Sequence, residues 1–142
     1  MDKSENKISI TKLFKLDQPE GSVMHGLKKS DKSFSGFGEA YFSTIDHNYI
    51  KGWKMQIKMH SNICVPLGKV KFTFVSEDFK SHKTFILGDD NYGVLSIPPK
   101  IWYCFKGLSE KTSLILNISD SEHNEEYIKK INLEEFPLKL KL

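Results

Sequence analysis

The sequence lacks arginine altogether, and all 21 of its basic residues are lysines. Lysine has no planar fork that can hold a phosphate through two parallel hydrogen bonds. Any phosphate contact must therefore come from single ammonium groups, hydroxyls or backbone N–H groups. With 18 acidic residues the net charge is only +3. A charge this small and this scattered argues against a nucleic-acid partner.

Long apolar runs and targeting segments are also missing from the sequence. No run of about 18 apolar residues is present, and the first ten residues, MDKSENKISI, have no apolar core of the kind that a signal peptide needs. We therefore expect a cytoplasmic protein that makes no contact with a membrane.

Cysteine is scarce, with only Cys64 and Cys104 in the chain, and both lie inside apolar runs that are typical of strands. We interpret them as buried thiols rather than as a disulfide. A chain of 142 residues that is 39% hydrophobic is long enough to bury a core without covalent or metal cross-links. We expect residues 1–142 to form a single domain.

Most of the chain alternates between polar and apolar residues with the period of a β-strand. Turn-forming clusters such as PLGK (66–69), GDDNYG (88–93) and IPPK (97–100) separate these runs. A succession of short strands predicts an all-β barrel or sandwich. The expected strands are residues 8–16, 36–45, 52–65, 68–77, 81–88, 93–98, 101–109 and 113–119.

One helix is expected, and it is near the end of the chain. The segment SDSEHNEEYIKKI (119–131) begins with residues that cap helices, carries glutamates in its first turns and ends on Lys129 and Lys130. This order of charges complements a helix dipole. The sequence therefore predicts a short C-terminal helix over residues 119–131.

The run GWKMQIKMH (52–60) raises the question of a binding surface. Its odd positions are apolar and predict a buried face. Its even positions form a polar row that faces either solvent or the inside of a barrel, and periodicity does not choose between the two. The polar row consists of Lys54, Gln56, Lys58 and His60.

Four segments, in order, resemble the dTDP-4-dehydrorhamnose 3,5-epimerase family of cupin-type jelly rolls, which act on nucleotide-linked keto-sugars. The most specific is NYGVLSIPPKIWYCFKGLS (91–109), and the resemblance covers about residues 36 to 135. It implies a jelly-roll barrel, a homodimer whose N-terminal strand (within residues 1–20) crosses to the partner, and a nucleotide-sugar ligand. It also implies a role in the synthesis of a cell-surface polysaccharide, O-antigen or capsule. The segments are GEAYFSTI (38–45), IKGWKMQ (50–56), VPLGKVKFTFV (65–75) and residues 89–119.

The chain departs from this family at its catalytic positions. The epimerases use a histidine base held by an aspartate, and a tyrosine acid. The residue-by-residue correspondence places Lys54 at the histidine, Leu133 at the aspartate, and Ile115 or Leu116 at the tyrosine. The related 3,4-ketoisomerases carry two histidines where this chain has Lys54 and Gln56.

Two hypotheses follow from these departures. The first is an isomerase or epimerase that acts on a nucleotide-linked 4-keto-sugar with a non-standard set of residues. The second is a catalytically inactive cupin that binds a sugar nucleotide or a partner enzyme.

Lys54 and Tyr103 are the candidate catalytic residues. A lysine in a pocket of low dielectric can have its pKa lowered enough to act as a base or to form a Schiff base, although Lys54 can equally bind phosphate or extend into solvent. Tyr103 stands where many family members have histidine, and it could donate a proton to the sugar.

The candidate substrate-binding residues are Gln56, Lys71, Lys51 and Trp53. Trp53 could stack on a base or a sugar, or it could lie in the core. The chain has no His-x-His pair, which cupin metal sites require, so we expect neither a metal nor another cofactor.

Overall fold

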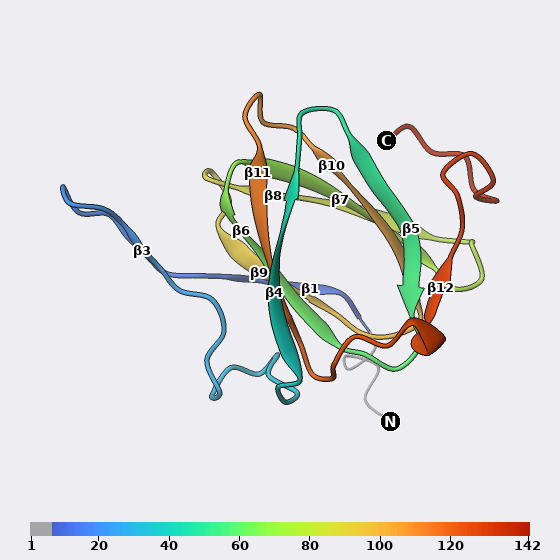
Figure 1. The fold of residues 1–142 in the computed structure, drawn as a ribbon, viewed down its shortest axis with the longest axis horizontal. Coiled ribbons are helices and arrows are strands. Elements are labelled where there is room, and N and C mark those ends of the chain that lie inside the picture. The colour runs from blue at the N-terminus through green and yellow to red at the C-terminus, as the bar shows by residue number, and fades with distance from the viewer. Residues whose placement is uncertain (1–6) are drawn as a thin grey trace.

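The computed structural model describes residues 7–142, and in these residues the fold consists of strands with a single short 3-10 helix, Glu125–Tyr127. The chain forms two facing antiparallel sheets joined into a flattened barrel (Figure 1). The all-β prediction is confirmed. The strands are β1 (Ser9–Lys12), β2 (Lys15–Leu16), β3 (Val23–Met24), β4 (Glu39–Ile45), β5 (Ile50–Gln56), β6 (Ser61–Leu67), β7 (Lys69–Ser76), β8 (His82–Gly88), β9 (Gly93–Ile97), β10 (Ile101–Gly107), β11 (Ser113–Ser119) and β12 (Ile128–Lys130).

The strand order shows how the barrel is wound. The first sheet has the order β1-β9-β6-β11-β4, and the second has the order β12-β5-β10-β7-β8. From β4 to β12 the chain passes repeatedly from one sheet to the other, as in a jelly roll. Side chains from both inner faces meet between the sheets and form the main core. This core includes Ile45, Ile63, Val65, Val70, Phe72, Phe74, Leu87, Leu95, Ile97, Tyr103 and Ile115.

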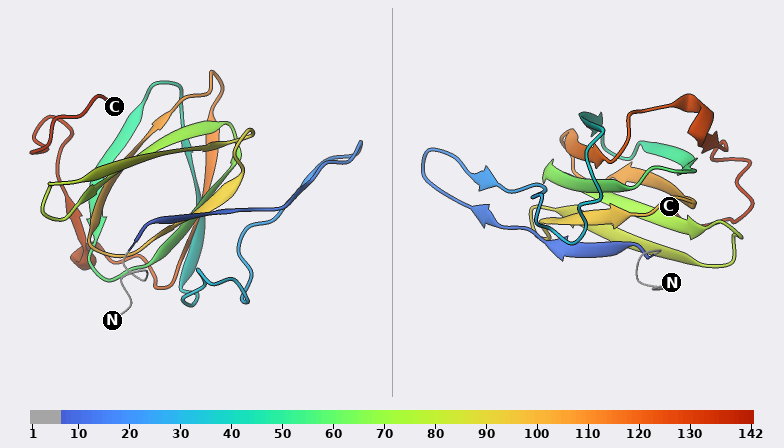
Figure 2. Two further views of the ribbon diagram at one scale, coloured as in Figure 1. Left: turned by 180° about the vertical axis from the view of Figure 1, so that it is seen from behind. Right: turned by 90° about the horizontal axis from the view of Figure 1, so that it is seen from below.

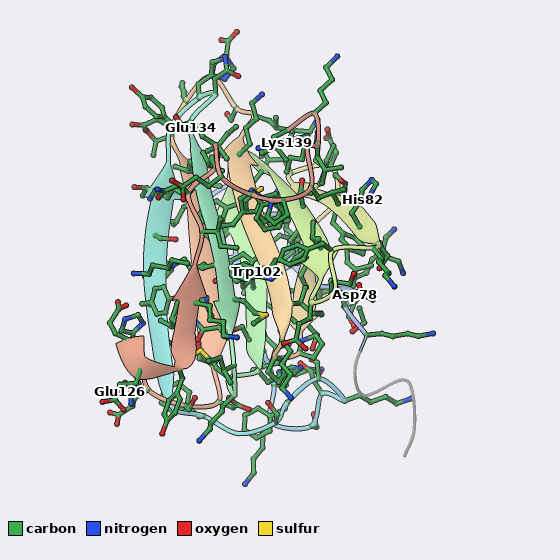
Figure 3. All side chains as sticks on the ribbon, turned by 90° about the vertical axis from the view of Figure 1, so that its right-hand side faces the viewer. Asp78, His82, Trp102, Glu126, Glu134 and Lys139 are labelled. Carbon is green, nitrogen blue, oxygen red and sulfur yellow. The ribbon has the colours of Figure 1, made fainter. Side chains whose placement is uncertain are left out.

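A second apolar cluster covers the outer face of the second sheet. Trp53 stacks on Phe136 with 3.9 Å between ring centroids, and Trp102 packs edge-on against Phe136. Figure 3 looks onto this face, with Trp102 near its centre and the C-terminal segment carrying Glu134 and Lys139 in the upper part of the view. Strands β5 and β10 are therefore covered on both faces, which explains why their apolar residues are so dense.

The predicted helix over residues 119–131 is wrong. Only the single 3-10 turn at Glu125–Tyr127 is helical, and β12 follows it at once. Strand β12 pairs with the edge of β5, and Trp53 and Ile131 exchange two backbone hydrogen bonds of 3.0 Å just beyond it. A short helix with few apolar residues is marginal by itself, so the hydrogen bonds offered by an open sheet edge outweigh the favourable helix charges.

The strand predicted over residues 52–65 is interrupted. Residues 57–60 lie between β5 of the second sheet and β6 of the first, so the chain changes sheets within the run. Only Lys54 and Gln56 of the polar row belong to β5, whereas Lys58 and His60 lie in the connection to β6. Alternation of polar and apolar residues does not indicate where a strand leaves its sheet, because both strands keep the same period.

The N-terminal strand pairs within the same chain. Strand β1 runs antiparallel to β9, and all four of its residues are exposed. Strands β2 and β3 then form a hairpin that projects well beyond the barrel (Figures 1 and 2). The first six residues of the predicted exchanged segment lie outside the described residues, and the exchange between subunits stays a prediction.

Both cysteines are buried and free, as predicted. The Cys64 sulfur lies 4.0 Å from the hydroxyl of Tyr92. In the described part of the chain, no helix has the length and apolarity needed to cross a membrane.

Candidate functional site

A small cavity of about 140 Å³ lies between the two sheets. Polar side chains line part of it, although it is continuous with the apolar core. Both of its lysines and one of its two tyrosines are residues that the sequence predicted. The lining consists of Tyr41, Ser43, Lys51, Lys54, Ile63, Phe72, Tyr103, Phe105, Ile115 and Asn117.

A bulge in β5 places Lys51 and Lys54 on the same side of the sheet. Cross-strand partners shift at this point, since Tyr103 lies opposite Lys54 whereas Cys104 lies opposite Gly52. The extra residue reverses the alternation, so residues three apart share a face. Gly52 has φ +145°, and a Cβ built there would lie 2.4 Å from the Cys104 Cβ. Glycine is therefore required at the bulge.

Lys54 is partly buried, and no carboxylate from residues 7–142 lines the cavity beside it. Burial lowers the pKa of Lys54, and the neighbouring ammonium groups of Lys130 and Lys51 lower it further, while Glu125 acts in the opposite direction. Lys130 is the cross-strand partner of Lys54 in the β12–β5 pair. The surroundings therefore make the ammonium form of Lys54 less favourable than it is for a lysine in water.

Tyr103 is only 6% exposed and lies beside Lys54 on β10. Burial raises the pKa of Tyr103, and Tyr41 raises it further, whereas a side-chain hydrogen bond with Gln56 lowers it. At neutral pH the hydroxyl therefore keeps its proton and can donate it. Gln56 is 9% exposed and contacts Tyr103 without being part of the cavity lining.

The opposite wall of the cavity carries polar residues that the sequence analysis missed. Asn117 Nδ2 donates to the Tyr41 hydroxyl at 3.0 Å, and the Ser119 hydroxyl donates to Asn117 Oδ1 at 3.1 Å. Burial raises the pKa of Tyr41, and the charge of Glu39 adds to the effect. The segment SLILNIS (113–119) did carry a sign of this polar wall, because Ser113, Asn117 and Ser119 occupy alternate positions between leucine and isoleucine residues. The serines and the asparagine face inward.

Two predicted substrate-binding residues lie away from the cavity. Trp53 is 2% exposed and belongs to the outer cluster with Phe136, which is the second of the two readings considered for it. Lys71 alternates with Val70 and Phe72, which point into the core, and so projects from the outer face of the second sheet. The lysines that alternate with the core residues of β7 therefore lie on the outer face of the sheet.

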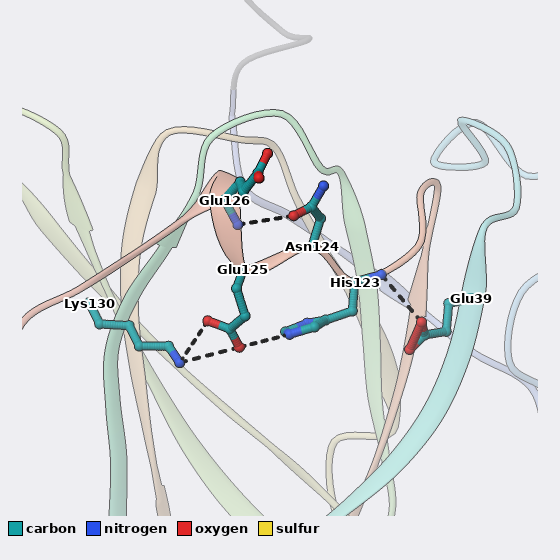
Figure 4. A network of polar contacts seen from close by, with 6 residues as sticks. All are labelled: Glu39, His123, Asn124, Glu125, Glu126 and Lys130. Carbon is teal, nitrogen blue, oxygen red and sulfur yellow. Dashed lines mark hydrogen bonds and ion pairs between the residues drawn. The ribbon is translucent and has the colours of Figure 1, made fainter.

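A polar network lies along the segment that joins β11 to β12. The His123 backbone N–H donates to Glu39 Oε1 at 3.2 Å, and His123 Nε2 lies 2.9 Å from Glu125 Oε1. Lys130 Nζ lies 3.1 Å from Glu125 Oε2. Figure 4 shows Glu125 between His123 and Lys130. This segment links the edge strand β4 of the first sheet to β12 of the second, next to Lys54.

His60 takes part in a hydrogen-bond network that lies outside the cavity. Its Nε2 lies 2.9 Å from the Ser96 hydroxyl and its Nδ1 lies 3.2 Å from the Ser35 hydroxyl, which donates to Asp120. Burial lowers the pKa of His60, and Asp120 opposes this. These bonds tie the loop before β4 to the end of β11, and His60 is not part of the cavity.

A larger groove of about 640 Å³ lies at the other open edge of the barrel, between the start of β1 and the β7–β8 hairpin. Its lining is mainly apolar and holds none of the predicted site residues. Among residues 7–142, no three histidine, cysteine, aspartate or glutamate side chains converge as metal ligands. The chemistry of the small cavity is thus that of amines, phenols and amides.

Solved structures with this architecture include enzymes of nucleotide-sugar metabolism. The chain is similar to a dTDP sugar isomerase from Desulfovibrio desulfuricans G20, with 28% identity, a TM-score of 0.86, and coverage of 93% of this chain and 89% of that one. It shares the fold of the sugar 3,4-ketoisomerase QdtA from Thermoanaerobacterium thermosaccharolyticum, solved with TDP, with 20% identity, a TM-score of 0.73, and coverage of 89% of each chain.

The fold is also shared with a dTDP-4-dehydrorhamnose 3,5-epimerase from Elizabethkingia anophelis NUHP1. That match has 15% identity and a TM-score of 0.77, and it covers 100% of this chain and 85% of the other. A search among curated protein sequences finds no match. The family model described as FdtA, WxcM-like, C-terminal, matches residues 6–138. Because this match spans nearly the whole sequence, the chain belongs to the FdtA family of WxcM-like C-terminal domains.

Proposed function

We propose that this protein is an isomerase or epimerase that acts on a nucleotide-linked 4-keto-sugar. The observation that carries the proposal is that the Lys54 amine and the phenols of Tyr103 and Tyr41 line a single cavity in a chain from the FdtA family. Moving a proton at a carbon beside a ketone requires a group that takes the proton and a group that returns it. These three side chains can hold or transfer protons.

The size of the cavity suggests which part of a substrate would lie inside it. Sites for whole small molecules usually enclose about 300–1,000 Å³, so a cavity of about 140 Å³ would take only the sugar end. The exposed Lys51 and Lys130 flank Lys54. Each ammonium group has three N–H donors, so each can contact the diphosphate in addition to its present partner, in place of the arginines that the chain lacks. The nucleoside would then lie outside the cavity, on the barrel surface.

The proposed setting is the cytoplasmic synthesis of a cell-surface polysaccharide, O-antigen or capsule, and the proposed assembly is a homodimer. Two exposed apolar regions support the dimer. On the outer face of the first sheet Phe42 is 65% exposed and Leu67 is 59% exposed. On the projecting hairpin Phe14 is 61% exposed. Monomeric proteins rarely leave such surfaces uncovered, and a second copy would bury both.

The test is to incubate the protein in D₂O with a panel of nucleotide 4-keto-6-deoxy-sugars and to follow deuterium entry at C3 and C5 by NMR. We expect exchange at one or both carbons with at least one sugar. A matched control is Lys129→Met, which removes an exposed lysine on β12 and should leave exchange unchanged. Binding without exchange across the whole panel would contradict the proposal.

A second candidate function is a binding module that holds a sugar nucleotide or a partner enzyme without catalysis. The observation that favours it is Ile115, which lines the cavity at a position where the epimerase resemblance places a tyrosine. This function predicts tight binding of the sugar nucleotide together with no deuterium exchange, so the same experiment separates the two candidates.

A further inference from the structure

We propose that Lys54 is a covalent catalyst, whose amine forms an imine with the keto carbon of the substrate sugar, and that Tyr103 and Tyr41 move protons on opposite faces of the adjacent carbon. The proposal rests on the proposed function, because it requires a keto-sugar in the cavity. It goes further by assigning a bond between protein and substrate and a role to each phenol.

The first support is that the Lys54 amine is free to react. Among the described residues no hydrogen bond or ion pair engages its Nζ, whereas Lys51 Nζ donates to the Thr44 carbonyl at 2.6 Å and Lys130 Nζ is paired with Glu125. No carboxylate lines the cavity around it. Of these three lysines, only Lys54 has no partner that would hold it as an ammonium ion.

The second support is the set of charges that faces Lys54. Lys51 on β5 and Lys130 on β12 are cationic neighbours, and Tyr103 and Tyr41 are neutral phenols. Within residues 7–142 the one anionic neighbour is Glu125, which is already paired with Lys130. This arrangement, together with burial, lowers the pKa of Lys54. A neutral amine is the nucleophile that imine formation requires.

The third support is the placement of the two phenols. Tyr103 stands on β10 of the second sheet and Tyr41 stands on β4 of the first, so they approach the cavity from opposite walls. The Tyr41 oxygen accepts from Asn117, which leaves its own proton available for donation. Inversion of a stereocentre needs a proton acceptor on one face and a donor on the other.

The bonding changes balance without any further reagent. The Lys54 nitrogen attacks the keto carbon, and the resulting carbinolamine loses its hydroxyl as water when Tyr103 supplies a proton. The products are a protonated imine on Lys54 and a Tyr103 phenolate. Because burial raises the pKa of Tyr103, this phenolate is a strong base and takes the proton from the carbon next to the imine. The C–H electron pair forms a C=C bond, and the C=N pair moves to nitrogen, giving an enamine.

The second half of the cycle restores the protein. Tyr41 donates a proton to the opposite face of the same carbon and becomes a phenolate, while the enamine returns to the protonated imine. Water then hydrolyses the imine, which releases the inverted keto-sugar and leaves Lys54 as an ammonium ion. That ammonium ion returns a proton to Tyr41, so all three side chains regain their starting states.

The experiment is reductive trapping with a defined probe. The protein is mixed with TDP-4-keto-6-deoxyglucose and sodium cyanoborohydride, and the product is examined by intact mass spectrometry and by peptide mapping. We expect about one reduced adduct per chain, located on Lys54 and absent when the hydride is omitted. Peptide mapping of the protein without any substitution is enough to locate the adduct.

Three controls separate this bond from random modification of the 21 lysines. Excess TDP, which has no keto group, should block the adduct on Lys54. Lys54→Arg replaces the reactive amine with a guanidinium of similar length that stays protonated, and it should reduce the adduct to background, with circular dichroism used to check that the variant folds. Lys129→Met removes an exposed lysine on β12 and should leave trapping unchanged.

The outcomes are distinct for the two proposals. Deuterium exchange together with a blockable adduct on Lys54 supports the covalent role. Exchange without that adduct, or an adduct spread over many lysines and insensitive to TDP, overturns the covalent role and leaves the isomerase function standing. Binding with neither exchange nor adduct overturns both.

Discussion

Tyr41 and Tyr103 face the same cavity from opposite sheets, and their proximity contributes to the raised pKa of Tyr103. Their sequence positions are more than sixty residues apart, and only the closure of the barrel brings them together. In the proposed reaction, this pairing gives each face of the sugar its own phenol.

Removing each phenol hydroxyl should therefore have a different effect. Tyr103→Phe should slow deuterium exchange by about 10²–10⁴-fold, the usual contribution of a positioned proton-transfer group. Tyr41→Phe should allow deuterium entry but suppress formation of the inverted product, because the donor on the far face is missing. The measurement is NMR of both the isotope content and the epimer ratio. Equal loss of exchange and inversion in the Tyr41 variant would contradict the assignment of the two faces.

Lys54→Met should be more stable than the unmodified protein near pH 7. Burial lowers the pKa of Lys54 in the folded state, so between that lowered value and the ordinary 10.5 the unfolded chain binds more protons than the folded chain. The stability of the unmodified protein therefore rises with pH across this window, and the advantage of the methionine variant should shrink. Urea unfolding at several pH values measures the difference, with Lys129→Met as the control. A difference that does not change with pH would argue against a lowered pKa.

Gly52→Ala should destabilise the fold and weaken sugar-nucleotide binding. The new Cβ would lie 2.4 Å from the Cys104 Cβ at φ +145°, so the bulge must shift, and with it the alignment of Lys51 and Lys54. The strained backbone alone costs about 1–3 kcal/mol. Gly21→Ala is a matched control, because Gly21 has the same φ and no atom within 4 Å of its Cβ position. Thermal melts and calorimetric titration with TDP test this, and equal effects of the two variants would refute the steric argument.

Phe136→Ala should destabilise the protein by about 3–5 kcal/mol while leaving the affinity for TDP intact in the folded fraction. Phe136 is 1% exposed and stacks on Trp53 outside the cavity. Loss of this ring should release the C-terminal segment from the second sheet, which would appear as a change in tryptophan fluorescence. Leu133→Ala, at a more exposed position of the same segment, should have a much smaller effect. A loss of TDP affinity in folded Phe136→Ala would instead connect Trp53 to the ligand.

Phe42→Lys should convert the proposed dimer into a monomer. Phe42 is 65% exposed on the outer face of the first sheet, where a charge is tolerated in water but not in an apolar interface. Analytical ultracentrifugation should give about twice the 16.4 kDa chain mass for the unmodified protein and a single chain mass for the variant. The control is Tyr49→Lys, at an exposed aromatic residue in the loop between β4 and β5. A monomeric unmodified protein would contradict the proposed assembly.

Much of the fold could be predicted locally, because each strand carries its own alternation and its own turn residues. The runs around β4, β7, β10 and β11 were expected at nearly the observed places. The helix expected over residues 119–131 does not form, because the open edge of β5 offers a strand more hydrogen bonds than the favourable helix charges can outweigh. Pairing with a strand far away in the sequence cannot be predicted from the residues of the segment alone.

The sequence by itself determined the all-β class, the buried thiols and the presence of Lys54, Gln56 and Tyr103 on strands. Only the tertiary structure decided which polar rows face the cavity. It turned Lys51 inward through the bulge at Gly52, turned Lys71 outward, buried Trp53 under Phe136, and placed Tyr41 and Asn117 opposite Tyr103. The physical reason is that both faces of a strand can be covered in a two-layer fold, so polarity along the chain does not identify the inner face until the layers are packed.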